Sequence, residues 1–589
     1  MLEPDDKTLL GPVNGNFTFK KRPDGTVDRS TVLCNFCSKE FSYHRSTSSL
    51  KYHLNAKHLA ASSEVRPSTA PDANVSNQSH QATLEQAFRR KLSKSTCDKL
   101  TNSIAKWVAM DCRPISVVED RGLTEALQIA SSDTTYKPPS RNTIVSKIQQ
   151  LYDTEKRAKD DVLAEAEYIA LTGDHWTSVS NHNYLGVTAH IIDSEWKLQS
   201  FALTMLKTVT RHFADACAEQ FLSVAEAWGV QHKVTTVGTD SARNMVAAVR
   251  KLPFDHMPCI AHMLQRTITV CLGDSGFGDA LAKCRKIVGH FKHSPANTEE
   301  LHQQQTGLGQ QREQLIQDVS TRWNSSLAMI SRLLKNQEAV KATLGRQKHK
   351  LVMLTTSEWD KLQRLETLLE PCRYVTELLG GETYVSCSVV LPALCHLYRT
   401  MEVSDEDPAY VERFKTAFKK DISERQANIN NRWLKMASAL DPRFKDLKYL
   451  PRGERAEVWT SLEALLQEKP SRATPEPSEE PAKKKRSLLL LASDSDSDDE
   501  MGPNRALSLY KAEPNISMEE CPLQWWSTHA GAHLQLSALA RKYLATPATS
   551  VPCERLFSLA GNIVQKKRAA LSSENVNKLV CLSNWLKEK

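Results

Sequence analysis

The 589-residue sequence lacks the features that mark secreted and membrane proteins. Its N-terminus, MLEPDDKTLL, does not have the pattern of a signal peptide. No apolar run approaches the roughly 20 residues that a membrane helix needs. The 14 cysteines are scattered along the chain and form no disulfide framework, so we expect reduced thiols and metal ligands. These absences favour an unsecreted chain without a membrane span.

A strong excess of one charge is also absent. The 77 Lys and Arg against 69 Asp and Glu leave a net charge of +8. Contact with nucleic acid must therefore come from local basic patches and not from the overall charge. Forty per cent of the residues are hydrophobic, which is enough for a sizeable core. The length favours about three or four domains.

Near its N-terminus the sequence contains four residues of the types that bind metal ions. Cys34 and Cys37 form a C-x2-C pair, and His53 and His58 follow as H-x4-H. A tight cysteine turn facing two histidines about one helical turn apart suits tetrahedral zinc. So short a segment has little core, and the metal must supply folding energy. The alternatives are four unrelated residues, or His44 as a ligand at a different spacing.

This spacing resembles a BED-type zinc finger, a DNA-binding module common in hAT transposases and their domesticated relatives. In that family a helix of the finger docks on DNA, and here it would span residues 46–58. Ser, Asn and Arg can read base edges, while Lys mainly contacts phosphate. The family usually has aromatic residues before the first cysteine, and this chain has Phe17 and Phe19. The candidate DNA-binding residues of the finger are Arg45, Ser49, Lys51 and Asn55.

Three acidic residues stand where a ribonuclease-H-like nuclease core carries its two-metal site. Two β-like apolar runs lead to Asp174 and Asp240, and Glu554 heads a late helix-like run. Mg²⁺ and Mn²⁺ prefer carboxylate oxygens, and two such ions about 4 Å apart can cut and join phosphodiesters. The three acids are therefore candidate catalytic residues. For each acid alone, an exposed or helix-capping role is the alternative.

The order of elements and several short motifs resemble hAT transposases. Residues 165–260 predict three strands, a helix, a strand and a helix, which is the order of the ribonuclease-H-like fold. In the family the tryptophan of an R-W pair lies near DNA, which makes Arg322 and Trp323 candidate DNA-binding residues, although a Trp is more often core. The motifs are D-x-W at Asp174, D-x-x-x-N at Asp240, C-x-x-H at Cys259 and His262, and R-W at Arg322.

The resemblance implies a multidomain α/β architecture. It comprises a small BED-type zinc finger, a ribonuclease-H-like core interrupted by a large all-α insertion, and a C-terminal hAT dimerisation region. The expected parts are a disordered N-terminus at 1–30, the finger at 31–60, a linker at 61–82, a helical pre-core region at 83–160, the first part of the core at 161–262, the insertion at 263–525 with a disordered stretch at 469–505, and the core completion with the dimerisation region at 526–589.

The C-terminal residues carry an apolar stripe at helical spacing, formed by Val576, Leu579, Val580 and Leu586. In the family this region dimerises, which implies a homodimer or a higher homo-oligomer. A stripe of period 3.6 is equally typical of intramolecular core.

A basic and acidic segment, KKKRSLLLLASDSDSDDE at residues 483–500, interrupts the predicted insertion. Its basic cluster is of the kind used for nuclear import, and the alternative is a solvated charge run. The four leucines between charged flanks resemble a SUMO-interacting motif, in which an exposed strand adds to the sheet of a partner. A helical turn that folds back on the insertion is the rival.

Two functions compete on this evidence. One is a nuclear DNA-binding regulator of hAT ancestry that binds double-stranded DNA through its zinc finger, and the acidic insert favours it. The other is a cut-and-paste transposase that uses Mg²⁺ or Mn²⁺, which the three acids favour. A protein-binding scaffold is the third possibility, and the zinc finger counts against it.

Overall fold

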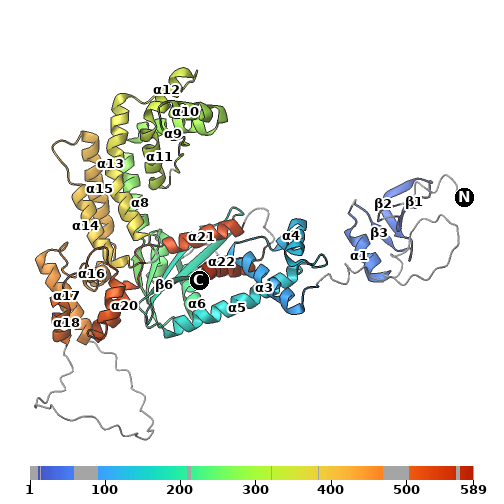
Figure 1. Ribbon diagram of the computed structural model, residues 1–589, viewed down its shortest axis with the longest axis horizontal. Coiled ribbons are helices and arrows are strands. Elements are labelled where there is room, and N and C mark those ends of the chain that lie inside the picture. The colour runs from blue at the N-terminus through green and yellow to red at the C-terminus, as the bar shows by residue number, and fades with distance from the viewer. Residues whose placement is uncertain are drawn as a thin grey trace, which may run out of the picture. The chain divides into compact units, whose positions relative to one another are not determined.

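The computed structural model describes residues 11–13, 15–44, 46–58, 91–208, 214–319, 321–381, 384–467, 503–564 and 571–587. These residues belong to two compact units, one within residues 1–88 and one within 89–589 (Figure 1). The expected linker 61–82 and the segment 483–500, with its predicted nuclear-import and SUMO motifs, lie outside the described residues. Among the described helices, none is both long enough and apolar enough to span a membrane.

The first unit is a three-stranded antiparallel sheet followed by one helix. The strands are β1 (Phe17–Lys21), β2 (Val27–Cys34) and β3 (Glu40–Ser42), in the order β1-β2-β3, and the helix is α1 (Ser48–Lys57). Its small core consists of five buried residues, Phe17, Val32, Cys34, Leu50 and Leu54.

The sheet begins earlier than the sequence predicted, because β1 and half of β2 lie in the segment 1–30 that was expected to be disordered. Phe17 explains the difference. Its ring is fully buried, it pairs with Cys34 across the sheet, and it packs edge-on against Phe41 with centroids 5.9 Å apart. So small a core cannot do without one of its largest side chains, and the finger therefore needs β1.

The second unit is built on a mixed five-stranded sheet with the order β6-β5-β4-β7-β8. Strands β4 (Ile169–Thr177), β5 (Asn183–Ile192) and β6 (Leu198–Thr208) are antiparallel neighbours, while β7 (Val234–Thr239) and β8 (Asp255–Pro258) run parallel to β4. Helices α6 (Ala214–Ala227) and α7 (Arg243–Val249) complete the predicted order of elements. The sequence did not predict β8, whose four residues DHMP are too few and too polar to show a strand pattern.

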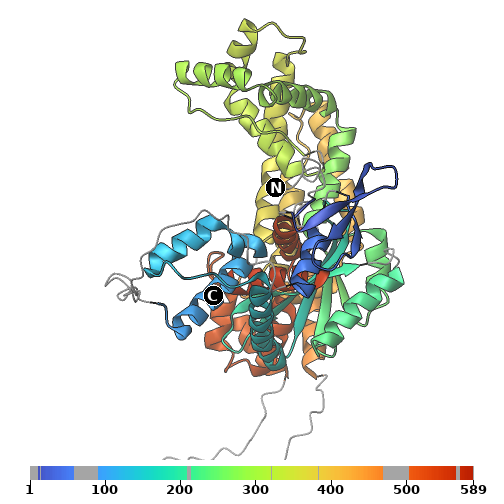
Figure 2. The ribbon, with the colours of Figure 1, turned by 90° about the vertical axis from the view of Figure 1, so that its right-hand side faces the viewer.

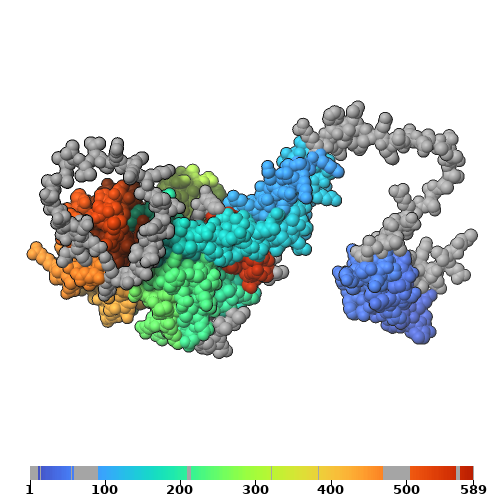
Figure 3. Space-filling model, turned by 90° about the horizontal axis from the view of Figure 1, so that it is seen from below, coloured from blue at the N-terminus to red at the C-terminus, as the bar shows by residue number. Residues whose placement is uncertain are grey.

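Helices from both ends of this unit cover the sheet together. The long α5 lies along one side of the unit (Figure 3), and it contacts both α3 and α22. Earlier residues of the same region form η2 and α4. The bounds are α3 (Lys94–Met110), η2 (Ile115–Glu119), α4 (Arg121–Ser131), α5 (Arg141–Glu165) and α22 (Ser573–Lys587).

Every described element from Ile260 to Leu544 is helical, as the sequence predicted for most of this span. Helices α8, α13 and α15 lie side by side in Figures 1 and 2 and share one large core. The elements are α8 (Ile260–Asp274), α9 (Gly278–Lys292), α10 (Pro295–Gly307), α11 (Trp323–Lys335), α12 (Gln337–Arg346), α13 (Thr356–Leu379), η3 (Cys387–Val389), α14 (Val390–Thr400), α15 (Ala409–Gln426), α16 (Asn431–Ala439), α17 (Arg452–Gln467), α18 (Pro503–Ala512), α19 (Pro522–His529) and α20 (Leu534–Leu544).

After these helices the chain returns to the sheet through α21 (Val551–Ile563), which contacts β4 and β5. The last helix, α22, then packs on the edge strand β6. Its side chains complete the hydrogen bonding of that strand: Asn584 Oδ1 accepts from the Ala202 N–H at 2.7 Å, and Trp585 Nε1 donates to the Ala202 carbonyl at 2.9 Å. The edge strand is therefore covered from within the chain and is not open for pairing with another sheet.

This packing settles the role of the C-terminal apolar stripe in favour of intramolecular core. Val576, Leu579, Val580 and Leu586 are all at most 5% exposed and belong to the core of the sheet. Of the two roles that the sequence left open for this stripe, a dimer contact is not available to Leu579 and Val580, because both side chains are buried within the chain.

Candidate functional site

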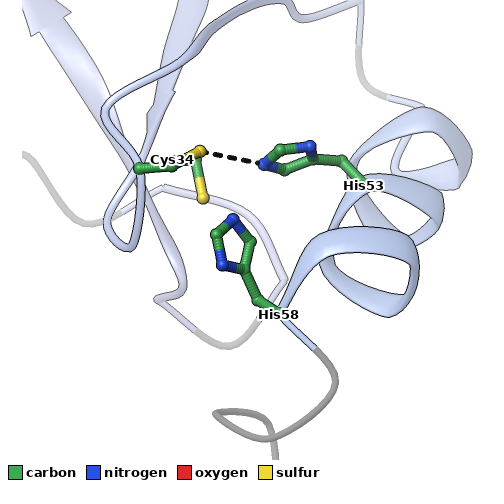
Figure 4. Close-up of side chains that lie close together, drawn as sticks. Cys34, His53 and His58 are labelled. Carbon is green, nitrogen blue, oxygen red and sulfur yellow. Dashed lines mark hydrogen bonds between the residues drawn. The ribbon is translucent and has the colours of Figure 1, made fainter.

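The four predicted zinc ligands come together at one end of the finger sheet. Cys34 ends β2, Cys37 follows in the turn, His53 lies on α1, and His58 caps the end of that helix. Their ligand atoms all lie within 4.8 Å of one another. Figure 4 shows the side chains of Cys34, His53 and His58 pointing toward a common centre. The Cys37 sulfur is 3.2 Å from His53 Nε2.

The chemistry of this set fits zinc. The cysteine turn is held by Ser38, whose φ of 55° is left-handed and whose N–H donates to the Cys34 carbonyl at 2.8 Å. The Nε2 atom of His58 is buried and has no hydrogen-bond partner, as an atom reserved for a metal would be. Burial, and then the charge of His58, lowers the pKa of His53, which favours the neutral imidazole that binds a metal. Two soft sulfurs and two imidazoles are a common donor set for zinc.

The helix of the finger presents one polar face to solvent. Leu50 and Leu54 are buried under the metal-binding residues, whereas Ser49 and Lys51 are exposed on the other side of α1. Arg45 and the side chain of Asn55, the other two predicted DNA contacts of the finger, lie outside the described residues.

In the second unit, two of the predicted acids come close together, Asp174 on β4 and Asp240 directly after β7. Strands β4 and β7 are parallel, and Thr172 lies opposite Gly238. Asp174 and Asp240 each follow two residues later, and they therefore lie level and on the same face. One detail differs from the prediction, because β4 does not end at Asp174 but continues to Thr177 in its pairing with β5.

Glu554 comes to these acids in the first turn of α21. A buried polar cluster holds this turn in place: Cys553 Sγ lies 3.4 Å from Thr172 Oγ1, which also hydrogen-bonds Thr188 and His190. Burial lowers the pKa of His190 to about 3, so this ring is neutral at physiological pH. The cluster links β4, β5 and α21 beneath the acids and explains how a residue so late in the chain reaches the sheet.

A histidine that was not among the predicted site residues completes the cluster. His262 Nε2 lies 3.7 Å from Glu554 Oε1. The adjacent Cys259 side chain, and then the Asp174 and Glu554 carboxylates, raise the pKa of His262. Cys259 Sγ also accepts the Ser550 N–H at 3.2 Å, which fixes the loop before α21. The C-x-x-H motif was the signal for this histidine, but its sequence context did not say which residues it would face.

The acids influence one another electrostatically. Burial, and then the charge of Asp240, raises the pKa of Asp174 to about 7, with a smaller contribution from Glu554. Hard carboxylate oxygens suit Mg²⁺ or Mn²⁺. Among the described residues, however, the finger alone brings three or more potential ligand atoms all within 4.8 Å of one another. The acidic cluster is thus more open than a closed metal shell.

The predicted R-W pair is divided between surface and core. Arg322 is exposed just before α11. Trp323 is only 3% exposed, packs in the helical core, and donates its backbone N–H to Gln265 Oε1 at 3.0 Å. The alternative role in the core is the one that the burial of Trp323 favours, and a DNA contact of this residue stays a prediction. The more accessible tryptophan near the acids is Trp176, whose ring stacks on Phe557 with centroids 6.2 Å apart.

Comparison with family models divides the chain in agreement with this architecture. Residues 19–59 match the BED zinc finger, and residues 172–266 match the ZBED1 RNase-like domain. Residues 257–368 match the ZBED1 RNase-like helical domain, and residues 506–586 match the hAT family C-terminal dimerisation region.

Curated proteins are similar along most of the chain. The "Putative AC transposase" of Zea mays is 24% identical over 514 residues, which cover 80% of this chain and 63% of that protein. The human zinc finger BED domain-containing protein 4 is 23% identical, with 98% of this chain and 52% of that protein covered. The "Putative transcriptional regulator tpeD" of Talaromyces stipitatus is 21% identical over 75% of this chain and 56% of that protein.

The chain thus spans about half to two thirds of the length of these three relatives. Three of the family models match successive parts of this one chain: a BED finger, an RNase-like core and an hAT dimerisation region. The chain therefore carries a BED zinc finger and an hAT dimerisation region, and its homologues are AC transposases and zinc finger BED domain-containing proteins.

Proposed function

We propose that this protein is a nuclear DNA-binding regulator of hAT ancestry, which binds double-stranded DNA through its zinc finger. The observation that carries the proposal is the four-ligand set of the finger beneath a helix with an exposed polar face. Similarity to BED proteins and to a relative named as a transcriptional regulator supports it. Regulation of transcription and location in the nucleus are parts of the same proposal.

The exposed face of α1 carries the chemistry for DNA contact. Lys51 is exposed, and within the described part of the chain its ammonium group has no ion-pair partner. Such a free cation suits phosphate, while the Ser49 hydroxyl on the same helix can donate to or accept from a base edge. In this proposal Lys51 supplies affinity and Ser49 contributes to the choice of sequence.

Replacing Lys51 by Gln tests this division of roles. We expect the full chain to bind more weakly to a duplex selected from a randomised pool and to unrelated duplexes alike. The slope of log K against log salt should fall by about 0.9, the value for one lost phosphate contact. Fluorescence anisotropy at several salt concentrations measures both quantities.

Lys106→Gln is the matched control, because Lys106 is an exposed cation on α3 in the other unit. It should leave both quantities unchanged. A salt slope that is the same for Lys51→Gln as for the unaltered chain would contradict the assignment of Lys51 to phosphate.

Homodimerisation is also part of the proposal, and the match to the hAT dimerisation region supports it. Because the α22 stripe is core, any contact between copies must use other residues. Three large apolar side chains in or near that region are exposed, Leu509, Met518 and Leu534, with Leu534 at 73%. We assign the contact to this part of the surface. SUMO binding through residues 483–500 stays a prediction.

A second candidate function, metal-dependent DNA cleavage, is favoured by the level placement of Asp174 and Asp240 with Glu554 beside them. If these acids hold Mg²⁺ or Mn²⁺, the free energy of unfolding should depend on the presence of the metal ion. The raised pKa of Asp174 means that its ionisation disfavours the folded state, so stability is lost as pH rises from about 4 to about 7. A bound cation reverses this loss, since it favours the ionised carboxylates.

We therefore expect Asp174→Asn to stabilise the metal-free chain at pH 8 by up to about 4 kcal/mol and to change little at pH 4. Mn²⁺ should raise the melting temperature of the unaltered chain at pH 8 and not that of the variant. Calorimetry with and without a chelator measures both effects. Asp153→Asn, on the side of α5, is the control and should behave as the unaltered chain does, with the same dependence of stability on pH and the same rise in melting temperature with Mn²⁺. Equal responses to Mn²⁺ in the unaltered chain and in Asp174→Asn would argue against a metal at the acids.

A further inference from the structure

A cavity of about 500 Å³ opens beside the acidic cluster. It lies where α7, β8 and α8 meet the loop after α15, and α8 and α15 run side by side there (Figure 1). Ser241 and Met263 line it, and each directly follows a residue of the acidic cluster, Asp240 or His262. The cavity and the acids thus share one stretch of surface.

Three arginines line this cavity, Arg250, Arg266 and Arg425. Arg425 is paired with Asp421, and its Nε donates to Oδ2 at 2.6 Å. Arg250 and Arg266 are exposed, and within the described part of the chain neither guanidinium group has an ion pair or a hydrogen bond. Two unpaired cations beside a cavity suit an anionic ligand, and guanidinium groups match phosphate geometry.

His256 adds a neutral hydrogen-bonding group to the cavity. The Thr239 hydroxyl donates to the Asp240 carbonyl and lies 2.9 Å from His256 Nε2, so Nε2–H is the donor in that contact. Burial, and then the charge of Arg250, lowers the pKa of His256 to about 4, with an opposing effect of Asp240. The ring is therefore neutral, and its Nδ1 is an acceptor. The charges of Arg250 and Asp240 thus have opposite effects on the pKa of His256.

The remaining lining is largely apolar. Its apolar residues are Val246 of α7, Pro258 of β8 and Met263 of α8, with Ala427 and Ile429 from the loop after α15. The Asn430 amide is already engaged, because it donates to Asp255 and accepts from the Trp433 N–H. Apolar side chains, a neutral acceptor and exposed cations match the face, the edge and the phosphate of a nucleotide.

We propose that this cavity binds one unpaired nucleotide of a DNA strand, with its base against the apolar lining and its phosphates on Arg250 and Arg266. The inference rests on the proposed function in one respect only, that DNA is the partner. A strand is favoured over a free nucleotide because the cavity lies next to the acids, with Ser241 directly after Asp240 and His256 within reach of the charge of Asp240. The chain of phosphates can therefore continue across the neighbouring surface.

The test uses the full chain with Cys37→Ser, which removes the contribution of the finger. This protein should bind a fluorescent oligothymidylate about 20 nucleotides long in an anisotropy assay. Arg250→Gln together with Arg266→Gln should weaken binding at least tenfold and lower the salt slope by about 1.4, the value for two phosphates of single-stranded DNA. Lys99→Gln with Lys106→Gln, two exposed cations on α3, is the matched control and should change neither quantity.

A second variant separates the cavity from a merely basic surface. Ala427 lines the cavity and is exposed, so Ala427→Trp should fill the space without loss of charge and should also weaken binding. Equal binding by Ala427→Trp and the parent, or by the arginine pair variant and the parent, would overturn the proposal. Competition by thymidine monophosphate as effective per nucleotide as the oligomer would overturn the choice of a strand.

Failure here is distinguishable from failure of the proposed function. The latter is read from duplex binding by the chain with an intact finger, and the former from single-strand binding by the chain without one.

Discussion

Replacing Cys37 by Ser should remove zinc from the protein and abolish sequence-specific binding to duplex DNA. Among its described residues the finger has a core of only five buried side chains, so the metal supplies most of its folding free energy. Structural zinc is worth on the order of 10 kcal/mol in such modules, far more than this core can replace. The expected zinc content falls from one per chain to none, as measured by elemental analysis after dialysis, and duplex affinity falls to the non-specific level.

Two comparisons make this result specific. His53→Ala should have the same effect, since it removes a second ligand. Cys521→Ser changes an exposed cysteine in the other unit and should leave zinc content and DNA binding unchanged. The melting of the larger unit should be the same in all three variants. One zinc per chain in both Cys37→Ser and His53→Ala would refute the ligand assignment. A fragment used for this test must include β1, because Phe17 belongs to the core.

Val580→Asp should unfold the larger unit and not merely release monomers. Val580 is fully buried in α22, among residues of the sheet core. The substitution loses about 1.5–3 kcal/mol of burial and places an unpartnered carboxylate in an apolar site, which costs several kcal/mol more. The total, above about 5 kcal/mol, is comparable to the whole stability of many domains. Loss of cooperative thermal unfolding in calorimetry is the expected outcome.

Leu534→Asp provides the contrast, because this side chain is 73% exposed at the start of α20. Its effect on the free energy of unfolding should stay within about 0.5 kcal/mol. If Leu534 belongs to a contact between copies, sedimentation should show a lighter species that melts normally. A folded, monomeric Val580→Asp chain with an unchanged melting temperature would return α22 to the dimer interface.

The zinc site could be predicted from the sequence alone because its geometry is local. The two cysteines share one turn, and the two histidines share one end of a helix, so the spacing of Cys34, Cys37, His53 and His58 nearly determines their relative positions. Asp174 and Asp240 could also be predicted from the sequence, because each comes with a clear β pattern. Their level placement still depended on the parallel pairing of β4 with β7.

Tertiary structure decided what periodicity cannot encode. A period of 3.6 tells which face of a helix is apolar but not what covers that face, and so the stripe of α22 was open to a dimer until its contact with β6 was seen. Trp323 and His262 were read from two-residue and four-residue motifs, yet one is core and the other faces Glu554. The cavity beside the acids joins β8 to the loop after α15, segments about 170 residues apart. Such long-range contacts depend on the packing of the whole chain, whereas the sequence by itself determined the local zinc geometry, the order of the elements from β4 to α7 along the chain, and the resemblance to hAT proteins.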